Sequence, residues 1–384
     1  MLKGCLESVI ETNGDFACQV TLVDNASTDG VAGRAKSAFP SITVVEMEKN
    51  AGFAAAVNRG LAEVTEPYVL LLNTDTVIAP GALAAMAAAL EKGGGDCAGV
   101  APKMLSSSYE GVIDAVGTVM PLDGASFNRG IGQCDLGQYD RAEEVFGVCF
   151  GAALLQRQLF EPAAVGPLYE DYFLYFEDSD WCMRARSQGY RFLTIPNAVV
   201  NHLHSGVARH ESLDFKYRLI ELNTLKIVIR TFESPLRAAG IVAARCLRLV
   251  ARTLIRRKFI AANISALAGL AAELPRLLKE RQGLQRRRIV SDSKVFAMAA
   301  GENAFFDTVA YRPDRCLNSL IATYSKLLEN DRSPETGKIL AALYRLRQQA
   351  AAGEDVAGAE SEEIFQGLPA CVKSLLKAAA GVTV

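Results

Sequence analysis

The sequence of 384 residues lacks several patterns that would define a protein class directly. It contains neither the G-x-G-x-x-G fingerprint of dinucleotide-binding folds nor the G-x-x-x-x-G-K-[ST] phosphate loop, which argues against hydride transfer and ATP hydrolysis. Its nine cysteines include no C-x-x-C pair, which argues against a disulfide framework. Such cysteines are typical of reduced, buried thiols, so we expect a cytoplasmic protein.

Long apolar runs are also lacking. The N-terminal stretch MLKGCLESVIETNGDF has no apolar segment of the kind found in signal peptides, and the uncharged stretch at residues 259–272 is too short to span a bilayer. Half of the residues are hydrophobic, which is ordinary for a globular protein. The length allows one large domain with an appendage, or two domains.

The charge is distributed unevenly along the chain. Residues 226–288 contain 15 Lys or Arg against three acids, a charge of +12, and since the whole chain carries −2, the remainder carries −14. This asymmetry indicates that the two parts meet different partners or surroundings.

The first two hundred residues alternate short apolar strands with alanine-rich helices. We expect strands at residues 19–25, 42–48, 68–73 and 97–102, with helices such as FAAAVNRGLAEV between them. This βαβ series predicts an α/β fold with a mostly parallel sheet and helices on both faces. Ligands of such sheets bind outside the carboxyl ends of the strands.

Polar clusters follow three of these strands. The segments are residues 24–30 (DNASTDG), 50–52 (NAG) and 73–75 (NTD). Each alone is also explained as an ordinary turn. Three of them at one sheet edge favour a nucleotide site built from acids and amides.

A fourth cluster lies in the stretch LYEDYFLYFEDSDWCMRARSQGY. Aromatic residues at 172, 173, 175 and 176 precede Glu177 and Asp178 at the start of an expected helix. Acids in a first helical turn often only complement the helix dipole, and this explains Asp180 equally well. Asp178 follows an apolar aromatic wall, which raises the pKa of a carboxyl group and makes it a candidate general base.

Two of the three histidines fall in the extended segment IPNAVVNHLHSG. His202 and His204 are two residues apart, so they share one face of a strand. An imidazole beside a carboxylate is a plausible pair of ligands for a divalent metal.

Taken in order, the motifs VDNASTDG, KNAGFAAAVNRG, LLLNTDT, GVCFGAALLQR, FEDSDWCMRARSQGY and IPNAVVNH resemble the family 2 glycosyltransferases of GT-A fold, in the rhamnosyltransferase-like branch. The resemblance covers residues 1 to about 230. It implies an inverting transfer of a sugar from a nucleoside-diphosphate donor to a glycan or lipid-linked acceptor in bacterial surface polysaccharide synthesis.

The resemblance also implies a role for each matching residue. Asp75 would hold a divalent metal, Mn or Mg, on the diphosphate, with His202 or His204 beside it. Asp178 would be the catalytic base, with Glu177 next to it. Asn73 stands where many relatives have an acid. The residues implied in nucleotide-sugar binding are Asp24, Asn25, Ser27, Asn50, Gly52, Asn58 and Asn73.

One departure concerns the start of the chain. Relatives begin with an additional apolar strand, whereas MLKGCLESVIE matches the helix that follows it, so we expect further residues upstream of Met1. A catalytically impaired binding or scaffold protein is the alternative function. A sugar-phosphate nucleotidyltransferase would need an N-terminal glycine-rich loop with a basic residue, which is absent from the sequence.

The expected domains are a catalytic domain at 1–210, a basic helical region at 211–290, and a helical C-terminal region at 291–384 with an acidic linker at 351–363. Arg245, Arg248, Arg252 and Arg256 recur at helical spacing. This basic stripe either packs on the catalytic domain or attracts an anionic membrane at the inner face of the cell. Nucleic acid is not expected, because no basic-aromatic interleaving occurs. The C-terminal helices are candidates for oligomerisation.

Overall fold

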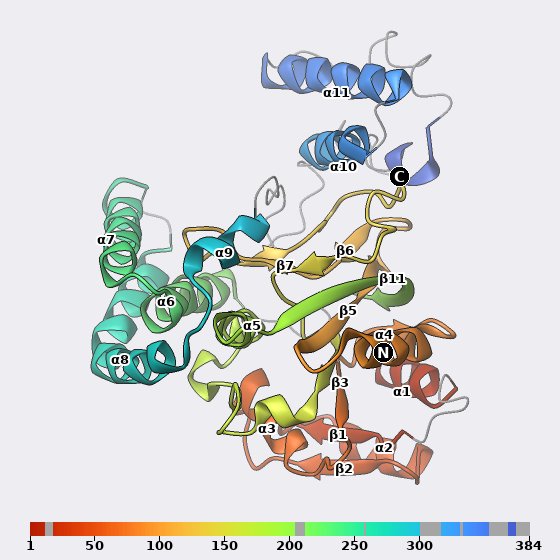
Figure 1. Cartoon of the computed structure of the whole chain (residues 1–384), viewed down its shortest axis with the longest axis vertical. Coiled ribbons are helices and arrows are strands. Elements are labelled where there is room, and N and C mark those ends of the chain that lie inside the picture. Colours follow the sequence, from red (N-terminus) through yellow and green to blue (C-terminus); the bar gives the residue numbers. More distant parts are fainter. Residues whose placement is uncertain are drawn as a thin grey trace.

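The computed structural model describes residues 1–11, 18–203, 212–256, 259–299, 316–330, 333–352 and 368–373. An α/β region built from the first half of the chain carries helices α6 to α9 along one side and α10 and α11 at one end (Figure 1). The expected α/β domain followed by a helical region is present.

The α/β region follows the expected alternation. Its elements are α1 (Leu2–Glu11), β1 (Thr21–Asp24), α2 (Val31–Ala38), β2 (Thr43–Glu46), α3 (Phe53–Leu61), β3 (Tyr68–Leu72), β4 (Thr76–Ile78), α4 (Ala82–Gly93), β5 (Cys97–Ser106), β6 (Ile113–Ala115), β7 (Thr118–Val119), β8 (Phe127–Asn128), β9 (Glu144–Val145), β10 (Ala152–Gln156), α5 (Glu177–Ser187) and β11 (Arg191–His202). All four strands expected from the sequence are present, and each end lies within four residues of its predicted position.

The central sheet is mixed rather than mostly parallel. Its main path runs β3-β10-β5-β11-β4; β5 and β11 are parallel, whereas β10 is antiparallel to both β3 and β5, and β4 is antiparallel to β11. Parallel neighbours need a long crossover. The connection between β3 and β4 has only three residues, and the connection between β5 and β10 contains the short strands β6 to β9 and no helix. Neither connection therefore has the helical crossover that is typical of parallel strands. The strands can be recognised in the sequence, whereas the type of connection between them cannot.

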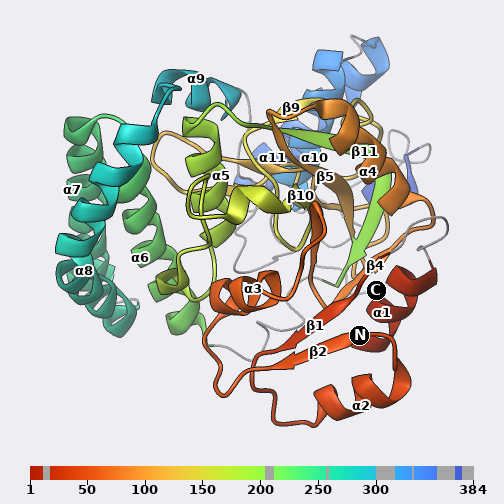
Figure 2. The same cartoon turned by 60° about the horizontal axis from the view of Figure 1, so that its bottom comes forward.

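Strands β1 and β2 form a separate two-stranded parallel sheet, which lies below β3 in Figure 1 and beside α3 in Figure 2. Among the described residues, β1 pairs only with β2, and β3 pairs only with β10. A cavity of about 1810 Å³ is lined by residues of both β1 and β3. All five apolar residues of β3 are therefore only half-buried.

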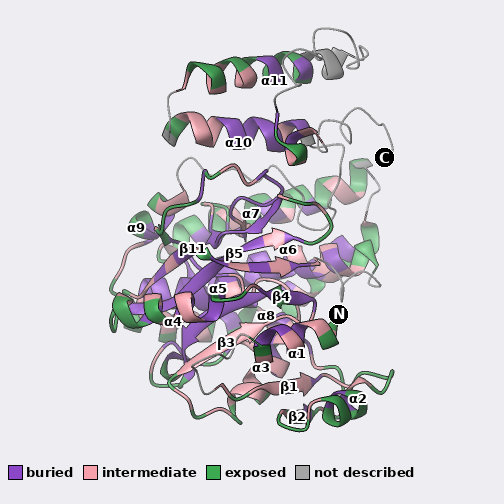
Figure 3. Cartoon of the chain, turned by 90° about the vertical axis from the view of Figure 1, so that its right-hand side faces the viewer, coloured by how far each residue is buried: buried purple, intermediate pink, exposed green. Residues whose placement is uncertain are grey.

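The core lies between the central sheet and α5. Trp181 of α5 is fully buried and stacks on Phe160, with ring centroids 4.6 Å apart. Its indole nitrogen donates to the carbonyl oxygen of Gly166 at 2.9 Å. Buried residues dominate β5, β11 and α5 in Figure 3. This packing fixes the first turn of α5, where Glu177 and Asp178 lie.

The helical region consists of α6 (Leu213–Thr231), α7 (Pro235–Ala251), the π-helical turn η4 (Arg252–Arg256), α8 (Ile260–Arg287) and α9 (Asp292–Phe296). Three arginines of the expected basic stripe contact Glu221 of α6. Arg245 is buried and donates to Glu221 at 2.9 Å, and Arg252 pairs with the same carboxylate at 3.2 Å. Arg248 lies 3.5 Å from it. The contacts of these three arginines support the alternative in which the basic stripe packs on the rest of the protein.

The C-terminal helices α10 (Cys316–Asn330) and α11 (Pro334–Ala352) pack on each other and on the loops around β6. Thr323 of α10 accepts a hydrogen bond from the backbone N–H of Cys134 at 3.1 Å. Most of the expected acidic linker lies outside the described residues. No helix in the described part of the chain combines the length and apolarity needed to cross a membrane.

Candidate active site

The large cavity gathers residues from five separate segments of the chain. It opens where β1 and β3 end and where α5 begins. The site residues expected from the sequence that line it are Asp24, Asn25, Ser27, Asn50, Gly52, Asn73, Asp75, Glu177, Asp178 and His202. Segments far apart in the sequence thus face one space, as the polar strand ends predict.

At one end of the cavity, amide side chains hold two loops together. Asn25 donates to the side-chain oxygen of Asn50 at 3.0 Å and accepts from the backbone N–H of Ala51 at 3.0 Å. Asp24 is buried and accepts from the backbone N–H of Ser27 at 3.0 Å. The carboxylate of Asp24 is therefore fixed at the floor of the loop that follows β1.

Gly52 lies where the chain allows no side chain. Its φ of +89° is in the region that favours glycine, and a Cβ atom there would lie 2.4 Å from the carbonyl oxygen of Phe173. The next residue, Phe53, donates its backbone N–H to the same carbonyl oxygen at 2.6 Å. The loop after β2 and the loop before α5 are thereby joined by backbone contact.

Asp75 belongs to a chain of buried ionisable groups. Its Oδ1 lies 3.3 Å from Nε2 of His202, whose Nδ1 lies 2.6 Å from Oδ2 of Asp114. Burial alone would lower the pKa of His202, but hydrogen bonds to Asp114 and Asp75, and their charges, raise it to about 10. The two carboxylates thus favour the protonated imidazole in this arrangement, and a metal ion bound at Nε2 would have to displace its proton.

Asp75 and His202 are the residues here that could hold a divalent metal. A carboxylate oxygen and an imidazole nitrogen, adjacent at the cavity wall, are suitable ligand types for Mn²⁺ or Mg²⁺. Among the described residues, however, no group of three or more His, Cys, Asp or Glu side chains could hold a metal ion. The protein thus offers two ligands, and any others would come from the bound diphosphate or water.

Glu177 and Asp178 form the second acidic centre of the cavity. Burial, and next the charge of Asp178, raise the pKa of Glu177 to about 8, and burial also raises the pKa of Asp178. Asp178 accepts hydrogen bonds from the backbone N–H and the hydroxyl of Ser179 at 2.6 and 3.1 Å. Oε2 of Glu177 is buried without a hydrogen-bond partner among the described residues. Both groups have the raised proton affinity of an effective base.

The loop that leads into α5 is strained. Phe173, Tyr175 and Phe176 have φ values of 61°, 70° and 73°, a conformation that bulky residues rarely adopt. Asn223 of α6 is fully buried, and its amide nitrogen lies 3.0, 2.9 and 2.8 Å from the carbonyl oxygens of Tyr172, Leu174 and Tyr175. The helical region therefore holds the loop that carries the two acids.

Three of the residues weighed at the sequence level are placed differently. Asn58 does not line the cavity; its side chain binds the backbone N–H and C=O of Leu168 and the carboxylate of Glu170. His204 lies outside the described residues. Asp180 is fully buried and accepts from the Tyr172 hydroxyl and from Arg184, which is a structural role.

Two residues that matter here were missed at the sequence level. Asp114 is a single acid within the apolar run VIDAV, and Asn223 is a single amide among the apolar residues of α6. A buried polar side chain needs a partner, so each of these isolated polar residues was a usable signal.

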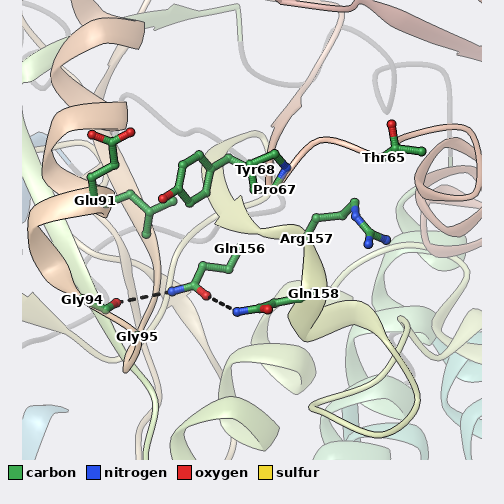
Figure 4. A pocket seen from close by; sticks show the side chains of 10 residues that line it. Thr65, Pro67, Tyr68, Glu91, Gly94, Gly95, Gln156, Arg157 and Gln158 are labelled. Carbon is green, nitrogen blue, oxygen red and sulfur yellow. Dashed lines mark hydrogen bonds between the residues drawn. The ribbon is translucent and has the colours of Figure 1, made fainter.

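A second, smaller cavity of about 480 Å³ lies at the opposite end of β3, near the start of that strand (Figure 4). Its lining contains none of the expected site residues. Gln156 donates to the carbonyl oxygen of Gly94 at 3.4 Å and accepts from Gln158 at 2.8 Å. Because none of the expected site residues lies here, we assign the site to the large cavity.

The fold and the acid-lined cavity at its strand ends define a glycosyltransferase domain of the GT-A type. Residues 1–162 match the family model described as "Glycosyl transferase family 2". Glu177, Asp178 and His202 lie beyond the matched residues.

Among curated proteins, the chain is similar to N-acetylglucosaminyl-diphospho-decaprenol L-rhamnosyltransferase of Mycobacterium tuberculosis. The two are 27% identical over 210 residues, which is 48% of this chain and 66% of the relative.

Solved structures similar to this one include GalNAc-T7 with UDP, GalNAc and Mn²⁺ (TM-score 0.49, 12% identity, 70% of this chain and 54% of that chain). Another is the mannosyltransferase PcManGT of Pyrobaculum calidifontis with GDP-Man and Mn²⁺ (TM-score 0.42, 18% identity, 78% and 81%).

Proposed function

We propose that this protein is an inverting glycosyltransferase that moves a sugar, with rhamnose the first candidate, from a nucleoside-diphosphate donor to a lipid-linked acceptor in bacterial surface polysaccharide synthesis. The observation that carries the proposal is the single cavity shared by Asp24, Asp75 and Asp178. The similarity to a rhamnosyltransferase named for a decaprenyl-diphosphate substrate supports the choice of sugar and acceptor.

In this proposal each end of the cavity has its own task. Asp24, with the loop joined by Asn25 and Asn50, binds the nucleoside of the donor. Asp75 and His202 face the diphosphate and supply protein ligands for a divalent metal, which neutralises charge on the leaving phosphates.

Asp178, with Glu177 beside it, acts on the acceptor. Its carboxylate removes the proton from the acceptor hydroxyl as that oxygen bonds to the anomeric carbon and the bond to the diphosphate oxygen breaks. A single displacement of this kind inverts the anomeric centre. The raised proton affinity that burial gives both acids supports this role.

Calorimetric titration of a panel of sugar nucleotides, with and without Mn²⁺, tests the proposal. One donor should bind more tightly with Mn²⁺, and Asp75→Asn should weaken that metal-dependent binding at least roughly tenfold. A transfer assay with a lipid-diphosphate sugar acceptor then measures turnover. If no sugar nucleotide binds with or without metal, the proposal is wrong.

A catalytically impaired binding protein is the second candidate. It is favoured by one observation: the Asp75 carboxylate already lies against the His202 cation, and the described residues contain no complete set of protein metal ligands. In that case a sugar nucleotide would bind in the titration, but no acceptor would be glycosylated.

Oligomerisation through α10 and α11 and a position at the inner membrane face also stay predictions.

A further inference from the structure

The outward face of α7 and η4 is apolar along its whole length. Leu236, Leu247, Leu254 and Ile255 are 85%, 70%, 71% and 80% exposed, and Val250 is also exposed. Most of them recur at helical spacing on one face. The other exposed positions of these elements are chiefly Ala and Gly, and residues 235–256 contain no acid. A soluble helix normally turns such residues toward the core.

Arg245 of the same helix and Arg252 of η4 point the other way, whereas Arg237 and Arg248 are exposed. Arg245 is buried against Glu221 at 2.9 Å and Asp123 at 3.2 Å, and Arg252 reaches Glu221 at 3.2 Å. These contacts fix the rotation of α7 about its axis, because a buried arginine without its carboxylates would be costly. The leucines therefore face outward as a consequence of ion pairs on the inner side.

The start of α8 continues the apolar surface. Ile260 and Ile264 are exposed there, and α8 contacts η4. The sequence at this corner reads Arg256-Arg257-Lys258, three consecutive cations. Figure 1 shows α7 and α8 at the outer edge of the molecule, on the far side of α6 from α5. In the sequence, these three cations stand between the exposed apolar residues of η4 and those of α8, and residues 235–272 contain no acid.

We propose that this apolar face, made of Leu236, Leu247, Val250, Leu254, Ile255, Ile260 and Ile264, lies in the interface of a membrane that contains anionic lipid. Exposed leucine and isoleucine side chains enter the boundary between headgroups and acyl chains, and adjacent cations bind anionic headgroups. The charge at residues 256–258 favours an anionic surface over a second copy of the chain, which would bring the same cations together. The inference does not depend on sugar transfer.

Co-sedimentation of the full chain with vesicles tests the proposal. The vesicles consist of phosphatidylcholine alone or mixed with phosphatidylglycerol. The wild type should bind the mixed vesicles, and the triple variant Leu247→Gln, Leu254→Gln, Ile255→Gln should bind at least roughly tenfold more weakly. Ile289→Gln is the matched control, because Ile289 is 77% exposed but lies outside the apolar face. It should bind like the wild type.

Replacing Arg256, Arg257 and Lys258 with Gln should remove most of the salt dependence of binding to the mixed vesicles. If the triple variant proves less stable, Leu236→Gln and Ile255→Gln singly, at the two most exposed of these positions, give the same comparison. Three results would overturn the proposal: no vesicle binding by the wild type, equal binding by wild type and apolar-face variants, or equal loss in the Ile289→Gln control. A dimer that the triple variant abolishes, without vesicle binding, would also overturn it and assign the face to a second copy.

Discussion

The side-chain amide of Asn223 in α6 donates to the carbonyl oxygen of Tyr175 at 2.8 Å, three residues before Asp178. The same nitrogen reaches two further carbonyl oxygens of this loop, at Tyr172 and Leu174. The loop contains three bulky residues with positive φ, a conformation that persists only when its surroundings impose it. One buried residue of the helical region thus determines where the acids of α5 lie.

Asn223→Ala should therefore affect activity and stability together. We expect the free energy of unfolding to fall by about 1–3 kcal/mol, because buried carbonyl oxygens lose their donor. We expect kcat to fall more than KM rises, together with a shift in the pH profile as the acids of α5 move. Urea denaturation and a pH series of the transfer assay measure these effects.

The control for this variant is Asn263→Ala. Asn263 is also a buried helical asparagine, which donates to Thr253 at 2.9 Å in the helical region. It should lower stability without changing the pH profile. An Asn223→Ala protein with a normal profile would show that this residue has only a structural role.

Asp178→Asn should separate chemistry from donor binding. We expect nearly normal binding of the sugar nucleotide, because the proposal assigns Asp178 to the acceptor, and turnover reduced roughly a hundredfold or more, the usual effect of losing a general base. Calorimetry and the transfer assay measure both on one protein. Asp96→Asn changes an exposed acid that pairs with Arg191 and should leave both unchanged. Near-normal turnover of Asp178→Asn would contradict the assignment.

The raised pKa of Glu177 predicts a pH dependence of stability. Its pKa rises from 4.5 to about 8 on folding, so the folded state binds a proton more tightly than the unfolded state. The stabilisation of the folded state by this proton is complete below pH about 4.5 and is lost as the pH rises toward about 8. Over this range the free energy of unfolding falls by at most about 1.4 kcal/mol per pH unit. Urea unfolding across this range should show a decline that Glu177→Gln removes. An unchanged slope in that variant would mean that other groups cause the decline.

Arg230 should connect the helical region to the α/β region energetically. It is fully buried, lies 3.1 Å from Asp171 and 2.7 Å from Glu280, and stacks on Tyr169. Arg230→Ala removes the fully buried cation that the partly buried Asp171 and Glu280 share and its packing on Tyr169, and should cost about 3–5 kcal/mol in urea denaturation. Arg276 contacts the same two carboxylates but is 41% exposed, so Arg276→Ala should cost about 1 kcal/mol or less. An equal loss of unfolding free energy in the two variants would contradict this expectation.

The α/β part of the fold was predictable because its signals are local. The apolar strands, the helix that begins at Glu177 and the polar residues at three strand ends can each be recognised within a few consecutive residues. The shared cavity follows from the rule that places ligands at the carboxyl ends of strands. Strand direction could not be derived in this way, because β10 and β4 return to the sheet through irregular connections.

The orientation of α7 was not predictable from helical periodicity. A pattern with arginines on one face and leucines on another fits either rotation of the helix. Glu221 on α6 and Asp123 in a distant loop decide between them, and neither is close to α7 in the sequence. The contact between His202 and Asp114 was not predictable for the same reason, because the two residues are 88 positions apart in the sequence.

The separation of β1 from β3 also determines how these strands exchange hydrogen with solvent. Every second backbone N–H of β3 points away from β10, toward the large cavity, where no strand pairs with it among the described residues. Those amides should exchange with deuterium much faster than their immediate neighbours, although they belong to one of the most apolar segments of the chain. The same free edge can accept an added strand, so an extended peptide that slows this exchange would identify the sequence that completes the sheet.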